Sequence, residues 1–358
     1  MIAAGRLLAP SSRSRPREPR AVLLVKPTAL GDVVTAVPVL RGLRRTFPEA
    51  RLGWLLSRAN AALVRHDSDL DQVVLFERRR LARTWRSPAA TGALGALLRE
   101  LRAGRFDWVI DLQGLFRSGF FSAATAAPVR AGFADAREGA AWFYTHRIEV
   151  QPVHTVERNI ALARALGVDA RPEDMTLQIP REGREFAEAL REARGPARSR
   201  LLVCVPPTRW RTKRYPVRHW RTVLRALTAD VPAVLLGTPG DRELCGAIAE
   251  GLGSGVIDLS GRTTIPQMVG LIAASAGVIC CDSAAKFIAP AVGVDAVVLF
   301  GPTRLERTGP YLRGTPVRAN VPCQGCLRKR CGHITCMDLI DPAEVISAAR
   351  EMLGKRNT

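Results

Sequence analysis

The sequence predicts an α/β protein of two doubly wound domains, each with a parallel sheet between layers of helices. Short apolar runs recur along the chain, and segments of helical periodicity, about 10–15 residues long, separate them. This alternation breaks off near residue 170 and resumes near residue 201, so the same pattern occurs twice. The length of 358 residues allows two domains that each bury a core.

The first half is predicted to be a basic leader followed by a Rossmann-like domain over residues 21–175. Residues 1–20 hold five Arg, one Glu and three Pro and lack a long apolar run, so we expect a disordered leader, no secretory signal and a cytoplasmic chain. Helical segments are expected at 33–47 and 155–167. The expected strands are 21–26, 51–56, 72–76, 107–112 and 129–133.

The second half is predicted to repeat this architecture over residues 201–340, after a linker. The segment 176–200 is charged and ends in Gly-Pro, which suits a linker or an interdomain helix. A terminal helix is expected within 341–358, because an Asp-Pro start precedes apolar positions at helical spacing. The expected strands are 201–206, 233–237, 277–282 and 296–301.

The chain is strongly basic. Lys and Arg number 53 against 33 Asp and Glu, which gives a net charge of +20. Five of the cations are Lys and the other 48 are Arg, a skew that codon bias alone produces. The charge favours an anionic partner, either nucleic acid, a membrane surface or a phosphorylated small molecule. No apolar run reaches 18 residues, which excludes a membrane-spanning helix, and no nucleic-acid motif is present, so we expect no nucleic-acid partner.

The first junction between a strand and a helix, residues 27–32, ends in Asp32. At the start of a helix an aspartate caps the backbone N–H groups. At the carboxyl end of a parallel strand, where ligands of such sheets gather, it can instead serve as a general base. The sequence leaves both roles open. It contains neither a GxGxxG nor a P-loop motif, which argues against dinucleotide and P-loop chemistry.

Two junctions in the second half have the composition of an anion site. Residues 208–216 begin at Thr208 and place four cations within residues 209–214, Lys213 among them, which suits a phosphate or a solvated loop. At residues 281–286, Ser283 and the following N–H groups can face an anion or simply cap the helix. All three junctions are expected at one cleft between the domains.

The eight cysteines fall into two groups. Those in apolar runs are expected to be buried, and they are Cys204, Cys245, Cys280 and Cys281. The others lie near His333 at a spacing that resembles a zinc ligand set, and they are Cys323, Cys326, Cys331 and Cys336. We expect a structural role for this second group, with or without zinc or a disulfide, and no catalytic metal.

Several long segments, in order over residues 21–354, resemble glycosyltransferase family 9, the bacterial lipopolysaccharide heptosyltransferases. They are VKPTALGDVVTAVPVLRGLRRTFPEA, FDWVIDLQGLFRSGF, HTVERNIALARALG, TKRYPVRHW and DSAAKFIAPAVGVDAVVLFGPTRLERTGPY. The stretch GFADAREGAAWFYTHRI also resembles the subgroup that adds the first heptose.

The resemblance implies a GT-B fold and transfer of heptose from ADP-heptose to the Kdo region of a lipid A precursor, an anionic glycolipid at the cytoplasmic face of the inner membrane. It implies inversion at the anomeric carbon with no metal and no cofactor. The aspartate of the family's LGD motif, its base, matches Asp32. The donor residues of the family match Thr208, Lys213 and, less closely, Asp241. Candidates on the acceptor side are Gln113 and Arg117.

The chain departs from the family at one junction. Family members read D-[ST]-G-x-x-H, and here the residues are Asp282, Ser283, Ala284, Ala285, Lys286 and Phe287. Ala284 fits if its φ is negative, whereas Phe287 removes a polar contact to the donor. Lys286 can supply charge, but a helix turns about 100° per residue, so it is expected to point elsewhere. The substitutions leave open another nucleotide sugar or acceptor, or an impaired homologue. A basic, non-enzymatic binding module is a further alternative.

Overall fold

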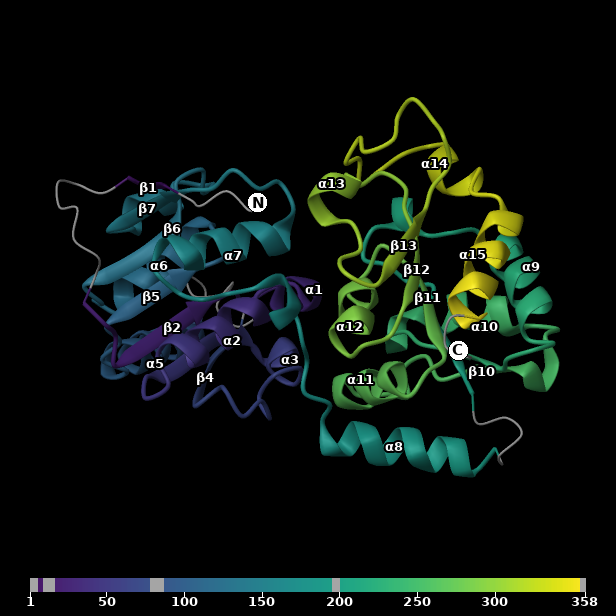
Figure 1. Cartoon of the computed structure of the whole chain (residues 1–358), viewed down its shortest axis with the longest axis horizontal. Helices are drawn as coiled ribbons and strands as arrows, with labels where there is room; N and C mark the ends of the chain where they lie inside the picture. The colour runs from purple at the N-terminus through teal and green to yellow at the C-terminus, as the bar shows by residue number, and fades with distance from the viewer. Residues whose placement is uncertain (1–5, 9–16, 78–86, 195–199, 355–358) are drawn as a thin grey trace. The chain divides into compact units, whose positions relative to one another are not determined.

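The computed structural model describes residues 6–8, 17–77, 87–194 and 200–354 (Figure 1). The chain divides into two compact units, Met1–Thr176 and Leu177–Thr358. Each unit contains one sheet with helices on both faces, so the predicted doubly wound α/β architecture is confirmed. No helix among the described residues combines the length and apolar character needed to cross a membrane.

In the described part of the first unit, seven strands form a sheet in the order β1-β7-β6-β5-β2-β3-β4. Every neighbouring pair is parallel except β1 with β7, which is antiparallel. Without β1 this is the Rossmann order, with β2 and β5 side by side where the order reverses. The strands are β1 (Arg6–Leu8), β2 (Ala21–Val25), β3 (Arg51–Ser57), β4 (Gln72–Phe76), β5 (Trp108–Asp111), β6 (Val129–Phe133) and β7 (His146–Glu149).

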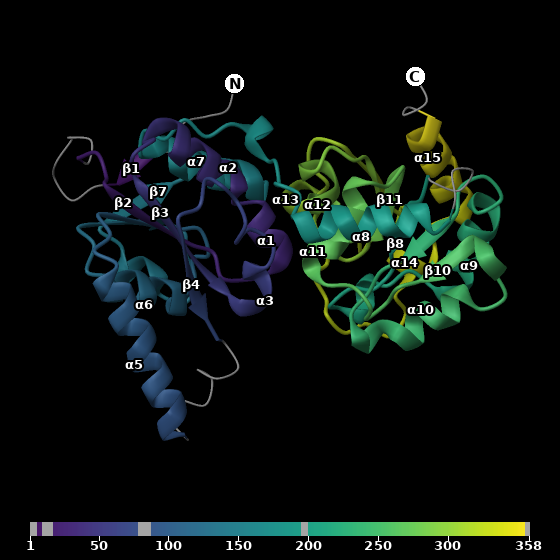
Figure 2. The ribbon, with the colours of Figure 1, turned by 90° about the horizontal axis from the view of Figure 1, so that it is seen from below.

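Helices cover both faces of this sheet. Figure 2 shows α2 and α7 on one face and α5 with α6 on the other. Alternate side chains of β2 point to opposite faces, and Leu23 and Val25 join the core under α5 and α6 together with Phe121. The helices are α1 (Leu30–Val34), α2 (Val37–Thr46), α3 (Arg58–Ala61), α5 (Pro88–Ala103), α6 (Phe116–Ala124) and α7 (Thr155–Ala165), with the 3-10 turns η2 (Ala140–Phe143) and η3 (Pro172–Asp174).

Two expectations for the first unit are corrected. Residues 6–8 were expected in a disordered leader, but they pair with β7 as the strand β1. Residues 1–5 and 9–16 of that leader lie outside the described residues. The single helical segment expected at 33–47 is divided between α1 and α2. The second helix starts at Val37 with Pro38 in its first turn, where the N–H that proline lacks is not needed.

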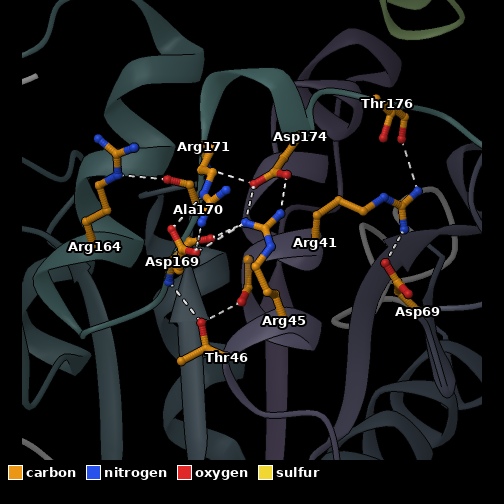
Figure 3. Close-up of polar contacts among 11 residues, drawn as sticks. Arg41, Arg45, Thr46, Asp69, Arg164, Asp169, Ala170, Arg171, Asp174 and Thr176 are labelled. Carbon is orange, nitrogen blue, oxygen red and sulfur yellow. Dashed lines mark hydrogen bonds and ion pairs between the residues drawn. The ribbon is translucent and has the colours of Figure 1, made fainter.

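The last residues of the first unit are bound to α2 by arginines (Figure 3). The guanidinium of Arg45 donates to the carbonyl oxygen of Asp169 at 2.7 Å and pairs with the carboxylate of Asp174. Arg41 pairs with Asp67 and Asp69, both at 2.6 Å, and also donates to the carbonyl oxygen of Thr176. These contacts fix the point at which the chain leaves the first unit.

In the described part of the second unit, six strands form an all-parallel sheet in the order β10-β9-β8-β11-β12-β13. This is again the Rossmann order, and it reverses between β8 and β11. The strands are β8 (Leu202–Val205), β9 (Ala233–Leu235), β10 (Val256–Asp258), β11 (Gly277–Cys281), β12 (Ala296–Leu299) and β13 (Gly314–Val317).

One face of the second sheet packs against α9, α10 and α15 around the buried ring of Trp220. The expected terminal helix is α15, and residues 355–358 lie outside the described residues. The helices are α8 (Arg181–Glu192), α9 (Val217–Leu227), α10 (Arg242–Ala249), α11 (Ile265–Ala273), α12 (Ala285–Ala291), α13 (Leu305–Thr308), α14 (Thr335–Asp338) and α15 (Pro342–Gly354), with the 3-10 turns η5 (Arg211–Lys213), η6 (Pro239–Asp241) and η7 (Gly253–Gly255).

The expected linker 176–200 contains α8, which packs against α11 and so belongs to the second unit. The two helices approach so closely that a Cβ built on Gly270 would lie 1.9 Å from the carbonyl oxygen of Gly183. A Cβ on Gly183 would in turn lie 2.2 Å from the carbonyl oxygen of Pro266. Glycine is therefore required at this crossing.

Candidate active site

In the first unit, the predicted base lies where the strand order reverses. The chain leaves the carboxyl end of β2 through Lys26 and reaches Asp32 in α1, while the neighbouring strand β5 leads to Gln113. The ammonium of Lys26 donates to the carbonyl oxygen of Leu112, and the N–H of Thr28 lies 3.4 Å from Oε1 of Gln113. The two loops that follow these strands are therefore joined, and Gln113 contacts the loop that carries Asp32.

Asp32 occupies the first turn of α1 and is partly exposed. Its Oδ2 accepts the N–H of Ala29 at 2.7 Å, so the capping role is present. A single backbone bond fixes the orientation of a carboxylate and still leaves lone pairs on it. Capping and proton acceptance are consequently compatible at Asp32.

Three basic residues that the sequence did not single out lie at this junction or near its Lys26. Lys26 is buried, and this burial lowers its pKa, while the nearby carboxylates of Asp32 and Asp111 oppose the shift. Arg158 and Arg137 lie close enough to lower the pKa of Lys26 further. The junction thus combines one partly exposed carboxylate with three cations, an arrangement suited to an anionic substrate that carries a hydroxyl group.

Asp111, at the end of β5, holds the turn that carries Gln113. Its Oδ1 accepts the N–H groups of Gln113 at 2.8 Å and Gly114 at 3.1 Å, and its Oδ2 accepts the Tyr144 hydroxyl at 2.6 Å. The carboxylate is fully buried, which raises its pKa against these hydrogen bonds. The sequence could have pointed to Asp111 in one way, because this residue is a carboxylate at the end of a buried apolar strand.

Arg117, the other acceptor-side candidate, is placed differently. It is exposed on α6, and its guanidinium carbon lies 5.5 Å from the ring centroid of Phe76 at the end of β4. The structure therefore brings Gln113 to the Asp32 loop, whereas the ring of Phe76 sets the position of Arg117.

In the second unit, the candidates meet at the carboxyl ends of three adjacent strands, β8, β11 and β12. Oδ2 of Asp282 accepts bonds at 2.6 Å from the ammonium of Lys213 and from the hydroxyl of Thr303, while Lys286 binds Oδ1. Burial alone would raise the pKa of Asp282, but the two lysines outweigh it and hold that pKa below its usual range. The two junctions of the second half therefore meet within this unit, and the cleft expected to include the Asp32 junction stays a prediction.

Lys286 points toward Asp282, and its expected direction relative to the donor stays a prediction. Asp282 precedes Lys286 by four residues, and their side chains form a buried ion pair. Asp282 lies in the turn before α12 begins, and this turn brings its carboxylate to Lys286 in the first turn of the helix. Lys286 thus belongs to the same cluster as Lys213.

The remaining donor-side candidates lie around this cluster. Ala284 has a φ of −63°, so the position does not need glycine. The Ser283 hydroxyl oxygen is buried, and the described residues offer it no hydrogen-bond partner. The Thr208 hydroxyl donates to the carbonyl oxygen of Trp210 at 2.7 Å. Asp241 binds Thr238 after β9 and lies 3.7 Å from Arg214. An unpaired buried hydroxyl beside a cation cluster is what an anionic ligand would complete.

The cysteine-rich segment lines one cavity of about 130 Å³ with Thr212 and His333, through Cys323, Cys326, Cys331 and Cys336. All eight cysteines are free thiols. Backbone N–H groups of His333 and Ile334 lower the pKa of Cys331, whereas burial raises that of Cys336 to about 11. In the parts of the chain that the structure describes, no group of three or more His, Cys, Asp or Glu is arranged to hold a metal ion.

The family model "Glycosyltransferase family 9 (heptosyltransferase)" matches residues 94–334, which is more than half of the chain. The chain belongs to glycosyltransferase family 9. The family resemblance predicted from the sequence motifs is therefore confirmed.

Two relatives within family 9 have similar lengths. The chain is 28% identical over 320 residues to lipopolysaccharide heptosyltransferase 1 of Pseudomonas aeruginosa, and the alignment covers 87% of each protein. It is 25% identical over 306 residues to lipopolysaccharide heptosyltransferase 1 of Escherichia coli strain K12, covering 81% of this chain and 90% of the relative.

Solved family 9 structures share the fold, which confirms the predicted GT-B class. The glycosyltransferase family 9 protein of Veillonella parvula DSM 2008 matches with a TM-score of 0.79 at 19% identity, covering 94% of this chain and 97% of that one. Escherichia coli heptosyltransferase WaaC with ADP matches with a TM-score of 0.75 at 22% identity, covering 93% and 99%.

Proposed function

We propose that this family 9 enzyme transfers heptose from ADP-heptose to the Kdo region of a lipid A precursor, with inversion and without a metal. One observation carries the proposal: each sheet presents its polar cluster at the point where its strand order reverses. The first cluster contains the carboxylate of Asp32, and the second contains Lys213, Asp282 and Thr303. The relatives named heptosyltransferase 1 support the choice of sugar.

In the proposed reaction Asp32 accepts the proton of the acceptor hydroxyl while that oxygen attacks the anomeric carbon of the heptose. The bond from this carbon to the diphosphate oxygen breaks on the opposite face, and ADP leaves with the bonding electron pair. Attack from the face opposite the leaving group inverts the configuration. The N–H of Ala29 orients the carboxylate for this step.

The departing diphosphate needs positive charge and hydrogen-bond donors. We assign this role to Lys213 and to the unpaired hydroxyl of Ser283. Thr208, whose hydroxyl donates to the carbonyl oxygen of Trp210 in this structure, is assigned to the same site. Asp241, in the 3-10 turn η6 that follows the neighbouring strand β9, is assigned to the ribose or adenine. These residues follow β8, β9 and β11, so one edge of the second sheet supplies the donor site.

The acceptor in this proposal is an anionic glycolipid at the cytoplasmic face of the inner membrane. Arg137 and Arg158, which lie close enough to Lys26 to lower its pKa, supply the cations, and Gln113 supplies an amide. Carboxylate and phosphate groups on the acceptor would pair with these cations. The excess of 20 positive charges would favour a peripheral contact with an anionic bilayer.

A second candidate donor is another nucleotide sugar. It is favoured by Phe287, which stands where the family has a histidine and is buried with only 5% of its surface exposed. A buried phenyl ring offers no hydrogen bond to a sugar hydroxyl, so donor choice can differ from that of the family.

Thermal unfolding with a panel of nucleotide sugars distinguishes the two donors. A ligand that binds the folded state at 100 times its Kd stabilises it by about 2.7 kcal/mol. We expect ADP-heptose to raise Tm more than ADP-glucose, UDP-glucose or GDP-mannose, and radiolabelled heptose to appear in the lipid acceptor. A larger rise with another sugar would establish the second candidate. Salt-sensitive DNA binding without any response to the sugars would contradict both.

A further inference from the structure

The inference concerns Lys286, a buried cation that the proposed chemistry does not use directly. Its ammonium pairs with Oδ1 of Asp282, and the side chains of Lys286 and Asp282 are only 4% and 3% exposed. The side chain of Lys213, on the other carboxylate oxygen, is 16% exposed. The two lysines therefore share one carboxylate, and Lys213 is the more accessible of the two.

Two aromatic rings hold Lys286 in place. Its ammonium lies 4.7 Å from the ring centroid of Phe287 and 5.0 Å from that of Phe300. A cation within about 6 Å of an aromatic face is attracted by the ring quadrupole, most strongly where water is excluded. Burial lowers the pKa of Lys286, whereas the carboxylate of Asp282 opposes that shift, and the ring of Phe287 likewise favours the charged form.

The charges within the cluster do not cancel. Two ammonium groups and one carboxylate leave a net charge of +1. The hydroxyl of Thr303 also donates to Oδ2, so that oxygen accepts two hydrogen bonds. Because Lys286 is enclosed, the surplus charge is available at Lys213, which also lies 4.5 Å from the ring centroid of Trp210.

We propose that Lys286 is a positioning residue that neutralises Asp282, so that Lys213 keeps its charge for the diphosphate of the donor. Phe287 and Lys286 act together in this proposal: the ring takes the place of a polar contact to the donor and stabilises the buried ammonium of Lys286. The proposal rests on the proposed function, because it takes a nucleoside diphosphate sugar as the ligand of this cluster.

Without Lys286 the cluster would consist of Lys213 and Asp282 alone, with a net charge of zero. Lys213 would then have to balance the charge of Asp282 and bind the diphosphate at the same time. We therefore expect the loss of Lys286 to weaken the binding of the phosphate groups and to leave the binding of the nucleoside unchanged. A purely structural role for Lys286 would weaken the binding of both.

The test compares ADP with adenosine by isothermal titration calorimetry on the full-length protein. We expect K286M to weaken ADP binding by about tenfold or more, a loss of about 1.4 kcal/mol or more, while adenosine affinity stays unchanged. K286Q can still donate a hydrogen bond to Asp282 without the charge and should show the same loss even if K286M folds poorly. K286R should retain binding, and R225M, which removes an exposed cation from α9, is the matched control.

A double variant tests the mechanism directly. If Lys286 acts by neutralising Asp282, then D282N/K286M should bind ADP more tightly than K286M, because Lys213 is released. Equal ADP affinity of wild type, K286M and K286Q, or an equal loss for ADP and adenosine, would overturn the inference and leave the proposed function intact. If the wild type binds no ADP, the proposed donor is wrong and the inference fails with it.

Discussion

Asp282 shows how one buried carboxylate organises the cluster after β11. Its four-residue spacing to Lys286 is visible in the sequence, yet a family comparison draws attention to Phe287 as a missing histidine. In the structure this ring has a second role, because it packs beside the ammonium of Lys286, which pairs with Asp282. At the residue scale, Phe287, where the chain departs from the family pattern, lies next to the buried ion pair of Lys286 and Asp282.

Asp282→Asn should destabilise the protein by about 3–5 kcal/mol at neutral pH, since breaking a buried ion pair leaves uncompensated charge. The pKa of Asp282 is lowered on folding, so its contribution is fully present above the ordinary carboxyl value of 3.8. That contribution is lost as the pH falls through the folded-state pKa. In urea titrations the gap between wild type and variant should stay constant from neutral pH to about pH 5 and narrow below 3.8.

Asp230→Asn, at an exposed position, is the matched control for this titration and should track the wild type. A gap between wild type and Asp282→Asn that widened on acidification would contradict the assigned direction of the pKa shift.

At the scale of elements, every strand expected from an apolar run is present, whereas β7, β10 and β13, in addition to β1, were not expected. β7, β10 and β13 contain three or four residues each. β10 lies at an edge of its sheet and is only partly buried, and β13 lies at the other edge and contains Pro316. β7 contains a single apolar residue, Ile148, which is also its one buried residue. A short, half-exposed strand lacks the continuous apolar signal of a buried parallel strand.

The residues of the candidate site could also be predicted only in part from the sequence. Asp32, Lys213 and Asp282 could be placed from the sequence because each follows a recognisable strand. Lys26, Asp111 and Arg158 could not be grouped, because their proximity depends on β2 lying next to β5. Strand order is a long-range property that local patterns do not encode.

The crossing of α8 and α11 gives a prediction about these elements. Gly270→Ala should cost about 1–3 kcal/mol, because the new methyl group meets the backbone of Gly183 and forces the helices apart. Gly246→Ala in α10 is the control: its Cβ meets nothing within 4 Å, and the change should stabilise by about 0.4–1 kcal/mol. Thermal unfolding of both variants is the measurement, and equal Tm values would show that the helices do not cross this closely.

For the whole molecule, the net charge of +20 says less about the binding partner than the sequence alone suggested. Many arginines pair with acidic side chains, as Arg44 does with Asp71 and Arg158 with Asp135. Neither fold nor family follows from the charge. The two Rossmann-ordered sheets and the family 9 match establish them, and the charge is consistent with a diphosphate donor and an anionic acceptor.

The central claim is that Asp32 is the base of the transfer, and turnover by Asp32→Asn tests it most directly. The amide cannot accept the proton, so kcat should fall by about 10²- to 10⁴-fold or more. The Tm and the ADP affinity should remain those of the wild type, because the residues that we assign to the donor are in the second unit. A variant that folds, binds ADP and transfers heptose at close to the wild-type rate would contradict the account.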